Sequence, residues 1–133
     1  MSNAIYPKYK EALIKGAANI NLDDLTVKAA LVDTGVYTYN AAHDFFDDIT
    51  GVVGTPQAIN NTTILNGLFD GDNVTYTAVT GATVEAIVIF IDTGTPATSR
   101  VVAYIDTGAT GLPFTPNGGN ADILWNAAGI FQL

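Results

Sequence analysis

The chain has 133 residues, 48% of them hydrophobic, a size and composition typical of one domain with a buried core. It has no cysteine, which excludes disulfides and thiolate metal sites. Thirteen acidic residues against five basic ones give a net charge of −8, which disfavours binding to free nucleic acid. The longest apolar stretch, residues 86–91, is far too short to span a bilayer, and no signal peptide is recognised. We therefore expect a protein made in the cytoplasm that does not enter membranes.

The first predicted element is a helix over Tyr6–Lys15. Pro7 suits its first turn, apolar residues recur at helical spacing, and Gly16 suits its end. Three of the five basic residues of the chain, Lys8, Lys10 and Lys15, lie in this segment, ahead of an acidic body. We interpret residues 1–17 as a helical docking arm and residues 18–133 as a single β-domain, although a solvated helix face would explain the same lysines.

Four strands are predicted in the body ahead of its C-terminal segment. Leu25–Asp33 and Asn73–Ala78 alternate between apolar and polar residues. Thr83–Asp92 is apolar on both faces at its centre, which places it in the middle of a sheet with a layer on each side. The N-terminal helix is the candidate for one layer. Arg100–Asp106 follows after a short connection and predicts an antiparallel hairpin with Thr83–Asp92.

The remaining sequence predicts a short final strand pair, Asp122–Asn126 with Gly129–Leu133, and two long loops, Thr50–Gln57 and Thr107–Ala121. The fold class is therefore all-β, a mainly antiparallel sandwich or a partly closed barrel, with one N-terminal α-helix.

The second loop carries Leu112 and Phe114 among four glycines and two prolines. A connection of this length without structure of its own is commonly a contact loop. If both apolar side chains are exposed there, they predict a surface for a partner.

Three apolar runs end in Asp-Thr-Gly, at residues 33–35, 92–94 and 106–108. The same triplet is the active-site signature of aspartic proteases, whose mechanism needs two carboxylates that share a proton. Too few residues follow Gly108 to complete that fold, and no Ile-Gly-Arg-like segment follows Asp33 at the expected distance. We interpret the triplets as strand endings, in which Asp and Thr bond the local backbone and Gly takes a positive φ.

Two acidic segments are candidates for cation sites. His43–Ile49 predicts a short helical turn, on which His43 and Asp47 would share a face at i,i+4, but an acidic helix cap explains the same residues. Residues 70–73 resemble the start of a calcium loop, yet Gly81 stands where the bidentate acid is required, which favours a tight turn. We predict no catalytic, cofactor-binding or metal site.

Several segments together resemble one protein family: residues 5–13, 27–33, 41–45, 84–86, 112–119 and 130–131. The family comprises small acidic proteins encoded among the virion structural genes of tailed bacteriophages. The resemblance extends over nearly the whole chain, although it consists of core and turn residues and includes no catalytic motif.

The resemblance implies a non-enzymatic virion protein, a capsid decoration or cement protein that binds the outer shell and stabilises contacts between capsid subunits. Its partners would be the major capsid protein or other virion subunits, with homo-oligomers possible. We expect the capsid contacts at Lys8, Lys10, Lys15, Leu112 and Phe114. One alternative is a tail- or fibre-associated protein that binds host surface glycans, and another is a homodimeric aspartic protease.

Overall fold

The computed structural model describes residues 3–133. Its elements, in chain order, are β1 (Ala4–Ile5), α1 (Pro7–Lys15), β2 (Thr26–Val32), the 3-10 turn η1 (Phe46–Asp48), β3 (Val52–Ala58), β4 (Thr63–Leu65), β5 (Leu68–Asp70), β6 (Val74–Tyr76), β7 (Ala86–Asp92), the 3-10 turn η2 (Pro96–Thr98), β8 (Val101–Ile105), β9 (Ala121–Ile123) and β10 (Phe131–Gln132).

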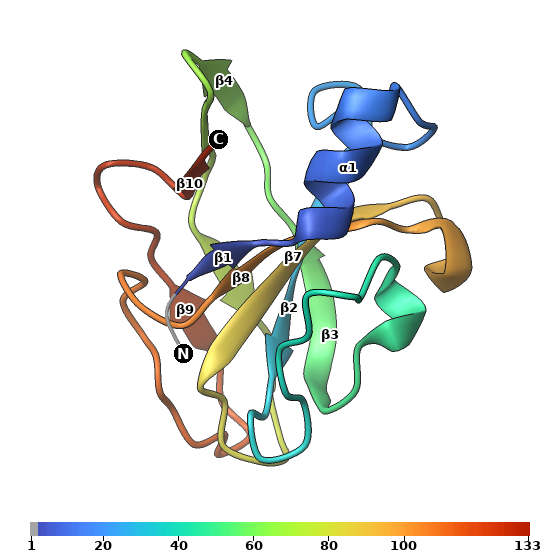
Figure 1. Cartoon of the computed structure of the whole chain (residues 1–133). Helices are drawn as coiled ribbons and strands as arrows, with labels where there is room; N and C mark the ends of the chain where they lie inside the picture. The colour runs from blue at the N-terminus through green and yellow to red at the C-terminus, as the bar shows by residue number, and fades with distance from the viewer. Residues whose placement is uncertain (1–2) are drawn as a thin grey trace.

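The strands form three antiparallel sheets (Figure 1). The main sheet has five strands in the order β1-β8-β7-β2-β3, and two smaller sheets have the orders β10-β5-β4 and β6-β9. The predicted antiparallel all-β class with an N-terminal helix is confirmed, and the described strands do not close into a barrel. Within residues 3–133 no helix is long and apolar enough to cross a bilayer.

Strand β7 lies at the centre of the main sheet, as predicted. It pairs with β2 on one side and with β8 on the other, and every residue from Ala86 to Ile91 is buried. The predicted hairpin with Arg100–Asp106 is confirmed in the pairing of β7 and β8. A strand with isoleucines on one face and Val88 and Phe90 on the other requires an apolar layer on each side.

The segment between β2 and β3 covers one face of the sheet. Phe90 stacks on Phe46 of η1, with 4.0 Å between ring centroids. On β8 of the same face, Tyr104 packs against Tyr39, with centroids 5.4 Å apart. The sequence predicted that the N-terminal helix would cover one face of the sheet, but the segment between β2 and β3 supplies most of this layer. The two small sheets add apolar side chains to the same core, among them Phe69, Tyr76 and Ile123.

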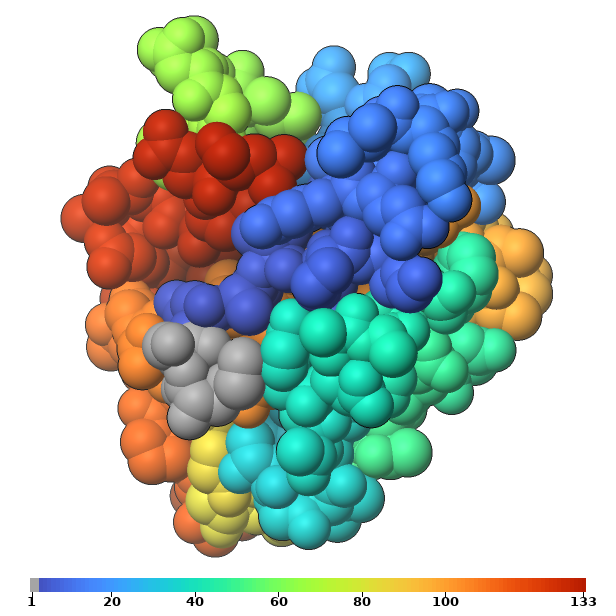
Figure 2. All heavy atoms as spheres, viewed as in Figure 1, coloured from blue at the N-terminus to red at the C-terminus, as the bar shows by residue number. Residues whose placement is uncertain are grey.

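The N-terminal segment belongs to the core of the body. Strand β1 extends the main sheet by pairing with β8, and Tyr6 and Tyr9 are buried. The hydroxyl groups of Tyr6 and Tyr37 lie 2.6 Å apart in a buried hydrogen bond. Helix α1 ends at Gly16, whose φ of 63° is left-handed, as the sequence predicted. The helix is held by its buried stripe and extends toward one end of the molecule (Figures 1 and 2).

The prediction of a loop over Thr50–Gln57 is wrong, because most of it forms β3. Gly54 and Pro56 suggested a loop, but they lie in a β-bulge, where Ala29 pairs with Gln57 and the register then shifts. Strand β3 is also the edge of the sheet, where the missing N–H of proline is tolerated.

The predicted final strand pair is also wrong. β9 pairs with β6, and β10 pairs with β5, so the two C-terminal strands join different sheets. The chain does reverse between them, at a turn where the N–H of Gly129 donates to the carbonyl oxygen of Asn126. Local alternation located both strands, but it carries no information about partners more than forty residues away.

Candidate interaction surfaces

Two of the three Asp-Thr-Gly triplets close turns with their own carboxylates. The N–H of Gly35 donates to Asp33 Oδ1 at 2.8 Å, and the N–H of Gly94 donates to Asp92 Oδ1 at 2.9 Å. Asp92 also pairs with Lys28, with 2.7 Å between Oδ2 and Nζ. The hydrogen bonds from Lys28 and from the Gly94 N–H lower the pKa of Asp92.

The turn of the third triplet, residues 106–108, is held by a side chain from another segment. Asn3 Oδ1 accepts hydrogen bonds from the backbone N–H groups of Asp106, at 2.7 Å, and Thr107, at 3.0 Å. Because β2 and β8 both run antiparallel to β7, Asp33 and Asp106 lie at one end of the sheet and Asp92 at the other. The backbone contacts at all three sites support their interpretation as strand endings. Gly94 and Gly108 take the predicted positive φ, of 89° and 83°, but the prediction is wrong for Gly35.

The segment from His43 to Asp48 contains the predicted short helical turn, now seen as η1. The N–H of Asp44 donates to Asp48 Oδ2 at 3.1 Å, and burial together with the neighbouring Asp48 carboxylate raises the pKa of Asp44. His43 Nδ1 lies 2.9 Å from the hydroxyl of Tyr37, and so takes part in the hydrogen bonds of the core.

The possible calcium segment, residues 70–73, connects β5 to β6, and its acids are used locally. Asp70 Oδ1 accepts the N–H of Gly71, and Asp72 Oδ2 accepts the Asn61 side chain at 2.6 Å. Among residues 3–133 no group of three or more His, Cys, Asp or Glu side chains is placed to hold a metal ion.

The loop over residues 107–121 is held against the body. The backbone N–H and carbonyl of Phe114 bond to the carbonyl and N–H of Val84, at 3.0 and 2.8 Å. This bridge fixes the middle of the loop beside the start of β7, and both Leu112 and Phe114 pack partly against the core. The expectation that these two side chains are fully exposed is therefore wrong. Their role as partner contacts stays a prediction.

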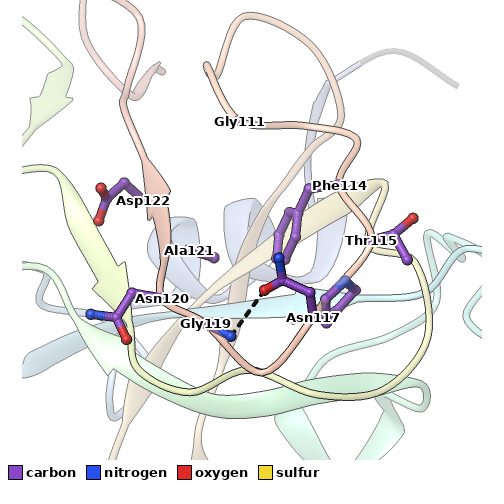
Figure 3. A pocket seen from close by; sticks show the side chains of 9 residues that line it. Gly111, Phe114, Thr115, Asn117, Gly119, Asn120, Ala121 and Asp122 are labelled. Carbon is purple, nitrogen blue, oxygen red and sulfur yellow. Dashed lines mark hydrogen bonds between the residues drawn. The ribbon is translucent and has the colours of Figure 1, made fainter.

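A hollow of about 310 Å³ lies between this loop and β9. Figure 3 shows the Phe114 ring and the Asn117 carboxamide on the loop side, whereas Asn120 and Asp122 point away from the ring, across β9. Asn117 Oδ1 accepts the N–H of Gly119 at 2.9 Å, which holds the loop in shape. The hollow offers a half-buried aromatic floor and a polar rim, which suits the docking of a single side chain.

Helix α1 presents the three predicted lysines on its surface. Lys10 and Lys15 are exposed, and Lys8 is half-buried. Glu11 lies 3.4 Å from Lys8 and 2.7 Å from Lys15, and these two ammonium groups lower the pKa of its carboxyl. Ile14, which the sequence analysis did not single out, is 88% exposed. The helix therefore offers an apolar side chain accompanied by positive charge.

A second projecting element is the hairpin formed by β4 and β5. Its two-residue turn, Asn66-Gly67, has φ values of 53° and 79°, the left-handed pair of a type I′ turn. Leu65 is 71% exposed and Ile64 nearly half exposed. The hairpin stands at the same end of the molecule as α1 (Figures 1 and 2). The N–H of Leu133 donates to the carbonyl of Gly67 and brings another exposed apolar side chain to the tip.

Sequence reasoning missed this hairpin, although its signal is present. Asn-Gly between apolar residues is the strongest short-range hairpin signal, because both residues tolerate positive φ. The exposure of Ile64 and Leu65 was not readable from the sequence, since an apolar strand of three residues is more commonly buried.

No protein-family model matches the chain, and no curated protein matches it with significance.

Proposed function

We propose that this chain is a non-enzymatic virion structural protein that decorates the outer shell of a capsid and stabilises contacts between capsid subunits. One observation carries the proposal. Large apolar side chains are held in solvent on two elements at one end of a well-packed β-body, Ile14 on α1 and Ile64 with Leu65 on β4. The resemblance to small phage virion proteins supplies the class of partner.

The exposed side chains suit adhesion. Burial of a leucine or isoleucine in an interface contributes about 1.5–3 kcal/mol, and each contact raises the effective concentration of the next. The lysines of α1 add attraction to an acidic partner surface near Ile14. The body beneath is rigid because β7 is buried on both faces, so the contact elements keep a fixed separation.

The carboxylates of the Asp-Thr-Gly triplets support a non-enzymatic function. Asp33 and Asp92 hold the N–H groups of their own turns, and they stand at opposite ends of the main sheet. A protease dyad within one chain would require two such carboxylates within hydrogen-bond distance, whereas a homodimeric protease would take the second from its partner, so the turn hydrogen bonds are the observation that supports a structural role.

Cosedimentation with purified bare shells tests the proposal. We expect Ile14→Asp and Leu65→Asp to remove binding while leaving the melting temperature nearly unchanged, since both side chains are mostly exposed. Val36→Asp is the matched control, because Val36 is also exposed but belongs to the turn after β2, and Figure 1 shows that segment at the end of the molecule away from α1. Full binding by both contact variants, or no binding by the wild-type protein, would refute the proposal.

The remaining predicted contacts need a different design. Leu112 and Phe114 pack partly on the core, so acidic substitutions there would disturb the fold together with any interface. Lys10→Glu changes only an exposed charge and tests the helix contact cleanly, whereas Lys15→Glu also breaks the pair with Glu11. The alternative of a tail- or fibre-associated glycan-binding protein predicts labelling on the tail and binding to a glycan array.

A further inference from the structure

A cleft of about 440 Å³ opens at the end of the main sheet where β2 and β8 end and β7 begins. Antiparallel pairing brings three separate chain segments to this end. Thr34 follows β2, Glu85 precedes β7, and Asp106 follows β8. All three residues line the cleft, so two of the Asp-Thr-Gly turns form part of its rim.

Tyrosine side chains form the wall of the cleft. Tyr39 and Tyr104 both line it, with their rings tilted by 53° to each other. Tyr104 is only 3% exposed, and within residues 3–133 no hydrogen bond reaches its hydroxyl, whose oxygen keeps contact with the solvent of the cleft. A buried phenol normally has a partner, and in this chain Tyr6, Tyr9 and Tyr76 all do. The Tyr104 hydroxyl is therefore available to a ligand.

Two of the residues that line the cleft, Glu85 and Asp106, carry carboxylates, which only accept hydrogen bonds, whereas its tyrosine and threonine hydroxyls both donate and accept. The N–H of Thr34 donates to Glu85 Oε2 at 3.0 Å, and no described residue bonds to the other oxygen of Glu85. Glu85 and Asp106 line the cleft together with Tyr104, and burial, followed by the negative charges of Asp106 and Glu85, raises the pKa of Tyr104. Of the described residues that line the cleft, none is Lys, Arg or His.

We propose that this cleft binds the guanidinium group of an arginine side chain presented by a partner protein. A guanidinium carries five N–H donors and no acceptor, which complements a site of carboxylate and phenol oxygens. It bonds to a carboxylate, here that of Glu85, through two parallel hydrogen bonds. Its plane stacks on an aromatic ring, here that of Tyr39. A neutral sugar could bond to the hydroxyls of the cleft, but it brings no positive charge to Glu85. The net charge of −8 adds long-range attraction for a cation.

Nuclear magnetic resonance titration of the whole protein at low salt tests this proposal. The probe is the peptide acetyl-Gly-Arg-Gly-amide, and its control replaces arginine with citrulline, a neutral analogue of nearly the same shape. We expect the arginine peptide to shift the amide signals of Thr34 and Thr38 saturably, and the citrulline peptide to leave them in place. Added salt should weaken the response, because the attraction is between charges.

The variant Glu85→Gln keeps an oxygen for the Thr34 N–H and loses the charge, so it should fold and bind about tenfold more weakly. Thermal melting checks its fold. Asp122→Asn is the matched control, an exposed carboxylate outside the cleft, and should bind as the wild type does.

Equal binding of both peptides, signals that do not move, or full affinity in Glu85→Gln would overturn the proposal. A saturable response of the same signals to a neutral hexose, with none to arginine, would replace it with a glycan site. The titration uses no shells, so its failure would leave the proposed decoration function untouched. Failure of the cosedimentation test with shells would likewise leave the arginine site untouched.

Discussion

Asp92 carries two separable interactions at the end of β7, and substitutions can remove them one at a time. Asp92→Asn removes the charge that pairs with Lys28 and keeps an oxygen for the N–H of Gly94, whereas Asp92→Ala removes both. The Lys28 and Asp92 side chains are 31% and 25% exposed, so the pair is partly shielded and contributes about 1 kcal/mol. The turn hydrogen bond contributes about 1 kcal/mol more.

Thermal melting measures both losses. For a chain of this length the entropy of unfolding is about 0.28 kcal/mol/K, so that 1 kcal/mol corresponds to about 3–4 °C. At pH 7 we expect Asp92→Asn to melt about 3–4 °C below the wild type and Asp92→Ala about 7 °C below it. The pKa of Asp92 is lowered from its ordinary value of 3.8, so the stabilisation is complete above that value and lost as the pH falls through the lower, folded-state pKa. The difference between wild type and Asp92→Asn should therefore shrink below pH 3.8.

Asp33→Asn is the control. Asp33 closes the same kind of turn, and among the described residues no base forms an ion pair with it. Asparagine keeps its acceptor, so this variant should melt within about 1 °C of the wild type. If Asp92→Asn were as stable as the wild type at pH 7, or if Asp33→Asn lost as much stability as Asp92→Asn, the assignment of these contacts would be wrong.

Two further predictions concern backbone and burial. Gly111→Ala should destabilise the protein by about 2 kcal/mol or more, because φ is +109° and a Cβ would lie 2.6 Å from a β9 carbonyl oxygen. Gly94→Ala, with positive φ but open space, should cost about 1 kcal/mol, and equal losses in urea denaturation would contradict this account. Burial raises the pKa of Tyr9 and of Tyr37 to about 12, so phenolate absorbance should develop well above pH 10 in the folded protein. Stability from these phenols is complete below pH 10 and lost as the pH rises toward 12, and titration of every phenol near 10 would refute their burial.

Strong local patterns predicted the centre of the fold. Three patterns indicate which residues are buried, and the structure agrees with them. They are the two-sided apolar run of β7, the alternation of β2 and the helical stripe that includes Tyr9. Where local signals conflicted, tertiary structure decided. Gly54 and Pro56 have the chemistry of a loop, but a bulge in an edge strand accommodates both.

The pairing of strands and the exposure of single side chains could not be predicted as well from the sequence. Nothing local distinguishes a C-terminal hairpin from two strands that each join a distant sheet, because pairing depends on contacts between remote segments. Exposure is also a tertiary property. The short bridge from Phe114 to Val84 turns an apparently free loop residue toward the core, and Leu65 is left in solvent at the tip of a hairpin.

Electron microscopy of virions at a resolution that distinguishes single proteins tests the central claim most directly. The account predicts that this protein lies on the outer surface of the capsid shell, with α1 and the tip of the β4–β5 hairpin facing the capsid subunits. Density for the protein on the tail or fibres alone, or on a shell with the opposite end of its β-body in contact, would contradict it.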